Sequence, residues 1–238
     1  MSSTNTLPTK VIAGVTIPDT PLITKALTFA REHSSDSTYN HLLRSFLLGF
    51  IISDKILPSR DREVHAITAI LHDLGFPLGH PPHSTVISAD KRFEVDGANA
   101  AREFIKREGS EGDWDKHRLQ LVWDAIALHT IGSIVFEKEA EVQACAYGIW
   151  ADFQGPDRVP GGLLSWEEYN RVVKVCMQLS LGAGIWEAGC ATPRPALTKL
   201  YLGIPKTGSH EGTERQYVPS LHYEATDHAR QYCRRMGR

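Results

Sequence analysis

Cysteine is scarce in this sequence, and its four residues are widely spaced. No Cys-x-x-Cys pair occurs, so the chain shows neither a disulfide framework nor a cysteine zinc site. Long apolar runs are also missing, since none reaches the roughly 20 residues that a transmembrane helix requires. The polar N-terminus lacks the basic and apolar regions of a secretory signal. We therefore predict a cytoplasmic protein with reduced thiols and no membrane partner.

The chain has no excess of charge of either sign. Its 26 Lys and Arg residues nearly balance 28 Asp and Glu residues, which gives a formal net charge of -2 and a pI near 6.6. Proteins that bind nucleic acid or anionic membranes normally present a basic face. We therefore expect no nucleic-acid partner and predict a small-molecule substrate. With 42% hydrophobic residues in 238, the chain is long and apolar enough to bury a substantial core.

Strand-like patterning is likewise missing, because no run with apolar residues at every second position is long enough for a sheet. Apolar residues instead recur at helical spacing between segments rich in Pro and Gly, which predicts an all-α helical bundle. We expect helices from about residue 21 and at about 37–57, 61–75, 97–106, 114–129, 139–153, 165–181 and 222–235. The predicted organisation is an irregular lead-in with a first helix at 1–34, a core at 35–190, and a C-terminal loop and helix at 191–238.

Several histidines and aspartates stand where the pattern predicts a buried side chain. His41 lies within an apolar helix, and His72-Asp73 belongs to an apolar segment at residues 69–75. Asp152 stands between apolar neighbours near the end of a later helix. Burying an unpaired carboxylate is expensive, and a bound metal offsets that cost. The combination predicts one divalent metal between the helices, held by His41, His72, Asp73 and Asp152.

Each of these residues also has an interpretation that needs no metal. A single histidine in an apolar helix is more often a hydrogen-bonded core residue than a ligand. Asp152 could form a salt bridge with Arg44 or cap a helix end. The joint pattern favours a metal site over these alternatives.

The same residues occur in an order that resembles the HD-domain superfamily of all-helical metalloproteins. The resemblance covers about residues 35–156 and lies in Tyr39-Asn40-His41-x-x-Arg44, Leu71-His72-Asp73-x-Gly75, His129 and Asp152. It implies that His41, His72, Asp73 and Asp152 bind one divalent metal. Zinc is the expected ion, with iron(II) and manganese(II) as alternatives.

Two residues differ from patterns found in other members of the superfamily, and they narrow the set of members that this chain resembles. Phe93 stands where dinuclear members have a further His ligand, and Phe76 stands where many members that act on phosphates have Lys. A phenyl ring neither binds a metal nor neutralises a phosphate, so the sequence favours a mononuclear site. With the Tyr-Asn-His segment and the helix start from Phe93 to Gly97, these residues resemble the cyanamide hydratase branch. That resemblance implies zinc-dependent hydration of cyanamide to urea.

The chemistry of that branch suits the remaining polar residues. A divalent metal lowers the pKa of bound water towards neutrality, and the resulting hydroxide can attack the carbon of a C≡N bond. The nitrogen must then gain a proton, and His129 is the candidate proton carrier, because histidine is a common general acid and base in catalysis. His129 could instead be a further metal ligand or a partner of one. Arg44 shares a helical face with His41. Three roles are open for it: to orient a site aspartate, to hold a polar substrate, or to form an ion pair without a role in chemistry.

The sequence does not exclude other functions. A phosphohydrolase of a nucleotide or another phosphate ester is the main alternative, with Arg44, Lys91 and Arg92 as candidate phosphate-binding cations. A non-catalytic module with a structural metal or a sensed ligand is a third. His80 and His83 lie in the Pro-rich loop after the His-Asp pair and are candidate substrate contacts. The apolar helices and the C-terminal segment could also form an interface between copies of the chain, so a homo-oligomer is not excluded.

Overall fold

The computed structural model describes residues 7–76, 86–110 and 112–180. Contacts divide the chain into one unit at Met1–Ile185 and another at Trp186–Arg238, and every described residue belongs to the first. The predicted C-terminal helix and the loop residues His80 and His83 lie outside the described residues. The domain boundaries expected from the sequence therefore stay predictions.

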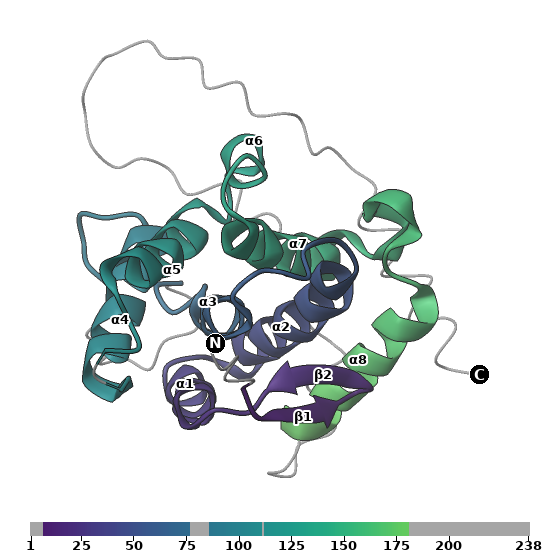
Figure 1. Ribbon diagram of the computed structural model, residues 1–238, viewed down its shortest axis with the longest axis horizontal. Coiled ribbons are helices and arrows are strands. Elements are labelled where there is room, and N and C mark those ends of the chain that lie inside the picture. The colour runs from purple at the N-terminus through teal and green to yellow at the C-terminus, as the bar shows by residue number, and fades with distance from the viewer. Residues whose placement is uncertain (1–6, 77–85, 111, 181–238) are drawn as a thin grey trace, which may run out of the picture. The chain divides into compact units, whose positions relative to one another are not determined.

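The described residues fold mainly into helices, which confirms the predicted all-α architecture (Figure 1). The α-helices are α1 (Pro21–Glu32), α2 (Asp36–Ile56), α3 (Arg62–Leu71), α4 (Phe93–Glu108), α5 (Lys116–Leu128), α6 (Gly132–Val135), α7 (Ala140–Gln154) and α8 (Trp166–Ser180). Two short 3-10 helices, η2 (Pro156–Arg158) and η3 (Pro160–Gly162), follow α7. Each helix predicted within the described residues is present, although α4 begins earlier than expected, and the four-residue α6 was not predicted.

The predicted irregular lead-in is wrong, because two short strands, β1 (Thr9–Ile12) and β2 (Val15–Pro18), form an antiparallel hairpin. Its turn residues Ala13 and Gly14 have φ angles of 53° and 73°, the left-handed conformation that tight hairpin turns use. Arg171 Nε of α8 donates a hydrogen bond to the Ala13 carbonyl oxygen at 2.8 Å. The hairpin escaped prediction because each strand has only four residues, too few for a clear period of two.

Polar capping residues explain why several helices begin where they do. The capping side chains are Thr20 for α1, Ser35 for α2, Asp61 for α3 and Asp115 for α5. Each accepts a hydrogen bond from a backbone N–H of the first helical turn, which would otherwise lack a partner inside the helix. The α3 helix ends at Leu71, so His72 and Asp73 directly follow it.

The centre of the fold is the antiparallel pair of helices α2 and α7. A Cβ atom on Gly148 of α7 would lie 2.0 Å from the Ser45 carbonyl oxygen of α2, and one on Gly49 would lie 3.2 Å from the Ala144 carbonyl oxygen. At Gly148 only glycine permits so close an approach of the two backbones. These contacts recur at steps of four residues along both helices, in opposite directions. The next pair in this register is His41 and Asp152, which do meet.

The turn after α3 is positioned by a second close approach of two backbones. A Cβ atom on Gly75 would lie 2.0 Å from the Phe93 carbonyl oxygen and 2.7 Å from the Gly97 nitrogen of α4. The α3 helix itself packs against α2, α5 and α7 (Figure 1). The segment with His72 and Asp73 is therefore enclosed by helices on several sides.

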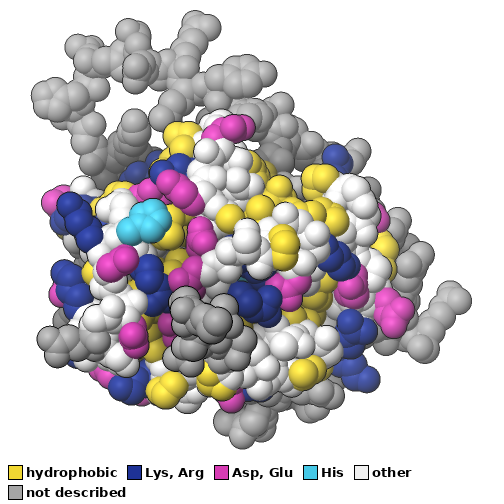
Figure 2. All heavy atoms as spheres, viewed as in Figure 1, with side chains coloured by type: hydrophobic (Ala, Val, Ile, Leu, Met, Phe, Trp, Pro, Cys, Tyr) yellow, Lys and Arg dark blue, Asp and Glu magenta, His cyan; other side chains and the backbone are white. Residues whose placement is uncertain are grey.

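The surface gives no sign of a single large charged patch on the face drawn in Figure 2. Basic side chains there lie among acidic and apolar ones, in keeping with the near balance of charges in the sequence. Neither α2, with its 21 residues, nor any other described helix is apolar enough along its length to cross a membrane.

Replacing Gly148 with Ala should destabilise the protein by about 3 kcal/mol, because the added methyl group has no room between α2 and α7. The measurement is the free energy of unfolding, from urea denaturation followed by circular dichroism. Lys174→Ala, at an exposed position of α8, is the control and should change this free energy by no more than about 0.5 kcal/mol. Equal stability of the two variants would contradict the close contact.

Candidate metal centre

Four buried side chains converge where α2, α3 and α5 meet. His41 belongs to the N-terminal part of α2, whereas His72 and Asp73 follow the last residue of α3. His129 follows the last residue of α5. None of the four is more than 3% exposed. The structure thus brings together three predicted metal ligands and the predicted proton carrier from distant parts of the sequence.

The potential ligand atoms of His41, His72 and Asp73 all lie within 4.8 Å of one another. The Nε2 atoms of His41 and His72 are 3.1 Å apart. The Asp73 Oδ2 atom lies 3.7 Å from the His41 nitrogen and 3.6 Å from the His72 nitrogen. On the other side of the same carboxylate, His129 Nε2 lies 3.5 Å from Oδ1. Three imidazole Nε2 atoms therefore surround one carboxylate.

The Nδ1 atom of each ring contacts a hydrogen-bond acceptor. His72 Nδ1 lies 3.0 Å from the Ala69 carbonyl oxygen, and His129 Nδ1 lies 2.6 Å from the Ile126 carbonyl oxygen. His41 Nδ1 lies 2.7 Å from Asp152 Oδ2. A carbonyl or carboxylate oxygen only accepts, so Nδ1 is the donor in all three contacts. Each neutral ring then has its lone pair on Nε2, as in metal sites where histidine donates its other N–H to an oxygen.

This arrangement fits a divalent cation. The Nε2 atoms of His41 and His72 face each other at 3.1 Å, with the Asp73 carboxylate beside both. One cation could therefore be bound by both nitrogens and this carboxylate. Imidazole nitrogens with a carboxylate oxygen form a donor set suited to zinc, iron(II) or manganese(II). The residues present therefore fit the predicted metal, and the donor set leaves its identity open among these ions.

The charges of the cluster also favour a cation. Burial lowers the pKa of His72 to about 3, against the opposing effect of Asp73, so the ring is neutral near pH 7. Burial alone would raise the pKa of Asp73, but the adjacent histidines outweigh it and hold this pKa below its usual range. For Asp152, Arg44 and His41 likewise overcome the effect of burial and lower the pKa. The buried carboxylates of Asp73 and Asp152 are thus both ionised, and the partly buried Arg44 pairs with Asp152.

Asp152, the fourth predicted ligand, takes a different position from the other three. Its Oδ2 contacts Nδ1 of His41, the nitrogen of that ring that does not face His72. Arg44 holds the same carboxylate with two hydrogen bonds, from Nε to Oδ1 at 2.6 Å and from Nη2 to Oδ2 at 2.9 Å. The salt bridge between Asp152 and Arg44 that the sequence suggested is present. That Asp152 binds the metal directly stays a prediction, while its contact with His41 orients that ring.

Aromatic rings line the cluster. The Phe93 ring lies edge-on to His129 with centroids 5.8 Å apart, and Phe76 contacts Phe93 with centroids 5.5 Å apart. The Phe153 ring lies 4.6 Å from that of His41. The sequence identified Phe76 and Phe93 as apolar replacements for polar residues. Phe153 was missed, although its position directly after Asp152 was a signal that could have identified it.

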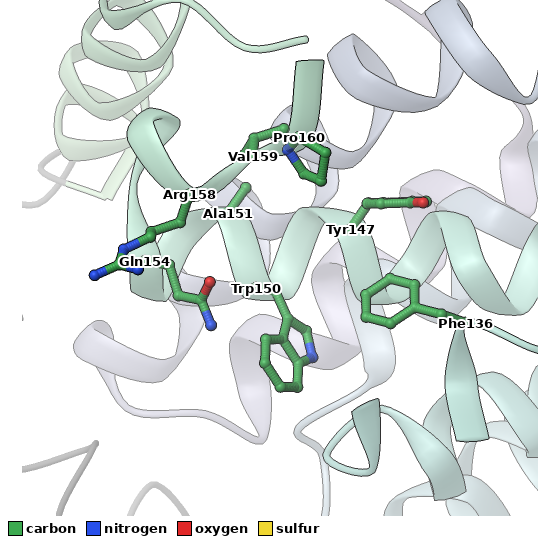
Figure 3. A pocket seen from close by; sticks show the side chains of 8 residues that line it. All are labelled: Phe136, Tyr147, Trp150, Ala151, Gln154, Arg158, Val159 and Pro160. Carbon is green, nitrogen blue, oxygen red and sulfur yellow. The ribbon is translucent and has the colours of Figure 1, made fainter. Parts of the chain in front are cut away.

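Another neighbour that sequence reasoning missed is Trp150, whose Nε1 donates to the His129 carbonyl oxygen at 3.2 Å. Trp150 also lines a cavity of about 230 Å³ beside α7 (Figure 3). The other lining residues are Phe136, Tyr147, Ala151, Gln154, Arg158, Val159 and Pro160. None of the predicted ligands lines this cavity, so it is distinct from the metal centre.

Replacing Asp152 with Asn should weaken metal binding about 10- to 100-fold, the range for carboxylates that orient a histidine ligand. The same change should cost about 3 kcal/mol of stability, because Arg44 loses its buried counter-charge. Zinc affinity is measured by competition with a chromophoric chelator, and stability by urea denaturation.

Asp54→Asn is the matched control for that change, because Asp54 is a more exposed α2 carboxylate paired with Arg60 and Arg62. It should leave zinc affinity unchanged. A loss far beyond 100-fold in the Asp152 variant would show that this carboxylate is itself a ligand. No loss would contradict its role in orienting His41.

Comparison with known proteins agrees with the geometry. A family model described as HD domain matches residues 38–146, a segment that contains His41, His72, Asp73 and His129 and ends before Asp152. A search of curated proteins and a search of solved structures each found no match. The matched segment and its buried His-His-Asp cluster show that this region of the chain is similar to the HD domain, which supports a metal-dependent enzyme.

Proposed function

We propose that the protein is a metal-dependent hydratase of a small nitrile-like compound, with cyanamide as the leading candidate substrate and urea as its product. The observation that carries this proposal is a buried cluster of imidazole nitrogens and one carboxylate walled by phenylalanine rings. The HD-domain match supports metal-dependent chemistry at this cluster.

The residues that would hold the metal are His41, His72 and Asp73, with Asp152 as a fourth ligand or as the partner of His41. When bound, a divalent metal lowers the pKa of a coordinated water and so supplies a nucleophile at neutral pH. The protein must then deliver a proton to the substrate nitrogen. We assign this step to His129, whose Nδ1 is bonded within α5 and whose Nε2 faces the cluster. This Nε2 can accept the proton that the water loses and pass it to the substrate nitrogen.

Arg44 has a narrower role in this proposal than substrate binding. Its guanidinium is bonded to both oxygens of Asp152, which in turn contacts His41. Arg44 is therefore a positioning residue that acts through Asp152. It keeps that carboxylate ionised and oriented in a buried site.

The charges near the cluster favour an uncharged substrate. The three cations considered for phosphate binding are all paired with carboxylates, Arg44 with Asp152, Lys91 with Asp90, and Arg92 with Glu94. The segment 77–85, which follows Phe76, contains no Lys or Arg in its sequence. A phosphate ester would therefore depend on the bound metal for neutralisation of its negative charge, because these three cations already pair with carboxylates. Cyanamide is small and neutral, and adding one water across its C≡N bond gives urea without a leaving group.

A phosphohydrolase of a nucleotide or another phosphate ester is the second candidate, because the HD-domain match supports that class of reaction as well. The two candidates share the metal and differ in substrate charge. Release of inorganic phosphate from a panel of nucleotides distinguishes them.

The purified protein should contain about one divalent metal ion per chain and should release urea from cyanamide. His72→Ala should lose the metal and reduce urea release to background, because the Nε2 atom of this ring faces both His41 and Asp73. Metal content is measured by inductively coupled plasma mass spectrometry, and urea by a urease-coupled assay. His117→Ala, at an exposed position at the start of α5, is the control and should retain both properties.

The metal content and the product released distinguish the two candidate functions from each other and from failure of the metal site. Bound metal with phosphate release in place of urea would favour the second candidate. Bound metal with neither product would exclude cyanamide and keep the site. Wild-type protein that binds none of zinc, iron(II) or manganese(II) would overturn the metal centre itself.

A further inference from the structure

Glu94 is a buried carboxylate that the proposed reaction does not use. It lies in the first turn of α4, is 1% exposed, and directly follows Phe93, whose ring contacts His129. A carboxylate is costly to bury unless it is bonded. The positive end of the α4 dipole favours a negative charge at this position, but it does not select any particular partner for the carboxylate.

The specific partner of Glu94 is Thr130, the residue that directly follows His129. Thr130 Oγ1 donates to Glu94 Oε1 at 2.7 Å. Arg92 pairs with the same carboxylate from the surface, where its own side chain is 65% exposed. The Glu94–Thr130 bond therefore ties the first turn of α4 to the C-terminal end of α5. That end is where His129 leaves the helix.

The first turn of α4 is also fixed to the turn that contains His72 and Asp73. The Phe93 carbonyl oxygen and the Gly97 nitrogen would lie 2.0 Å and 2.7 Å from a Cβ atom on Gly75, so the two backbones are in direct contact. Glu94 lies within this same turn of α4. Its bond to Thr130 thus links the segment that carries Asp73 to the segment that carries His129.

The placement of the α5 end decides where the His129 ring lies. His129 Nδ1 is bonded to the Ile126 carbonyl oxygen of its own helix, so the orientation of the ring relative to α5 is fixed. The distance of 3.5 Å between His129 Nε2 and Asp73 Oδ1 then depends on how α5 is held against the His-Asp turn. Besides the Trp150 bond to the His129 carbonyl oxygen, the Glu94–Thr130 bond supplies such a hold.

We propose that Glu94 and Thr130 are positioning residues that set His129 against Asp73 and thereby tune the metal centre. This inference rests on the proposed function, because it presumes that a metal binds at the cluster. It adds a pair of residues outside the ligand set that determines how the proton carrier faces the ligands. Neither residue is assigned a contact with the substrate.

Thr130→Val tests this role, because it removes the hydroxyl group and keeps the branched shape of the side chain. The Co²⁺-substituted protein provides a readout besides activity. His129 Nε2 lies 3.5 Å from Asp73 Oδ1, so a displaced His129 changes the surroundings of a proposed ligand. We therefore expect the visible absorption spectrum of bound Co²⁺ to change and its dissociation constant to rise about 10-fold, the low end of the range for residues next to a ligand. Thr130→Ser restores the hydroxyl group and should return both values to those of the wild type.

Thr20→Val is a matched control, because Thr20 makes the same bond elsewhere in the fold. Thr20 Oγ1 donates to Glu63 Oε1 at 2.7 Å, at the N-terminal ends of α1 and α3. The His-Asp turn lies at the opposite end of α3. Thr20→Val should lower the unfolding temperature and leave the affinity and spectrum of Co²⁺ unchanged.

The inference is overturned if Thr130→Val binds Co²⁺ with the wild-type affinity and spectrum. It is also overturned if Thr130→Ser fails to restore them, or if Thr20→Val changes them as much as Thr130→Val does. Wild-type protein that binds no Co²⁺ would overturn the metal centre on which the inference rests. The failure of the positioning role and the failure of the site are therefore distinguishable.

Discussion

The close approach of α2 and α7 is the constraint on which the rest of this structure depends. Gly148 lets the α7 backbone reach the Ser45 carbonyl oxygen, and the register that follows places Asp152 opposite His41. A one-residue shift between the two helices would rotate both side chains away from each other, since successive residues point about 100° apart around a helix. A contact between two backbones thus determines which nitrogen of His41 faces the cluster.

The charges of the polar cluster suit a metal-bound protein better than a metal-free one. Asp73 and Asp152 are ionised although buried, and His72 stays neutral for the same reason of burial. Replacing such a cluster with apolar residues of similar size would often stabilise a protein. Its presence in the middle of an apolar bundle is therefore better explained by chemistry than by stability. Among the described residues, Phe93 and Phe153 place apolar rings beside the imidazoles of His129 and His41.

The sequence predicted the helices and three members of the buried cluster because those signals are local. An apolar helix interrupted by His41 and an apolar segment with His72-Asp73 are both visible without a structure. The position of Asp152 was predicted as buried, but its contact with Nδ1 of His41 depends on the register of two helices far apart in the chain. The Glu94–Thr130 bond depends in the same way on how α4 meets α5. The hairpin was missed because its strands are too short to show a period.

A metal ion bound by His41 and His72 would also affect how the protein stays folded in a cell. A cation that binds the folded chain and not the unfolded chain adds stability by mass action, about 2.7 kcal/mol when its free concentration is 100 times the dissociation constant. Small domains are stable by only about 5 to 15 kcal/mol in total. The supply of metal then becomes part of the folding equilibrium. Scarcity of the ion would reduce the amount of intact protein as well as its activity.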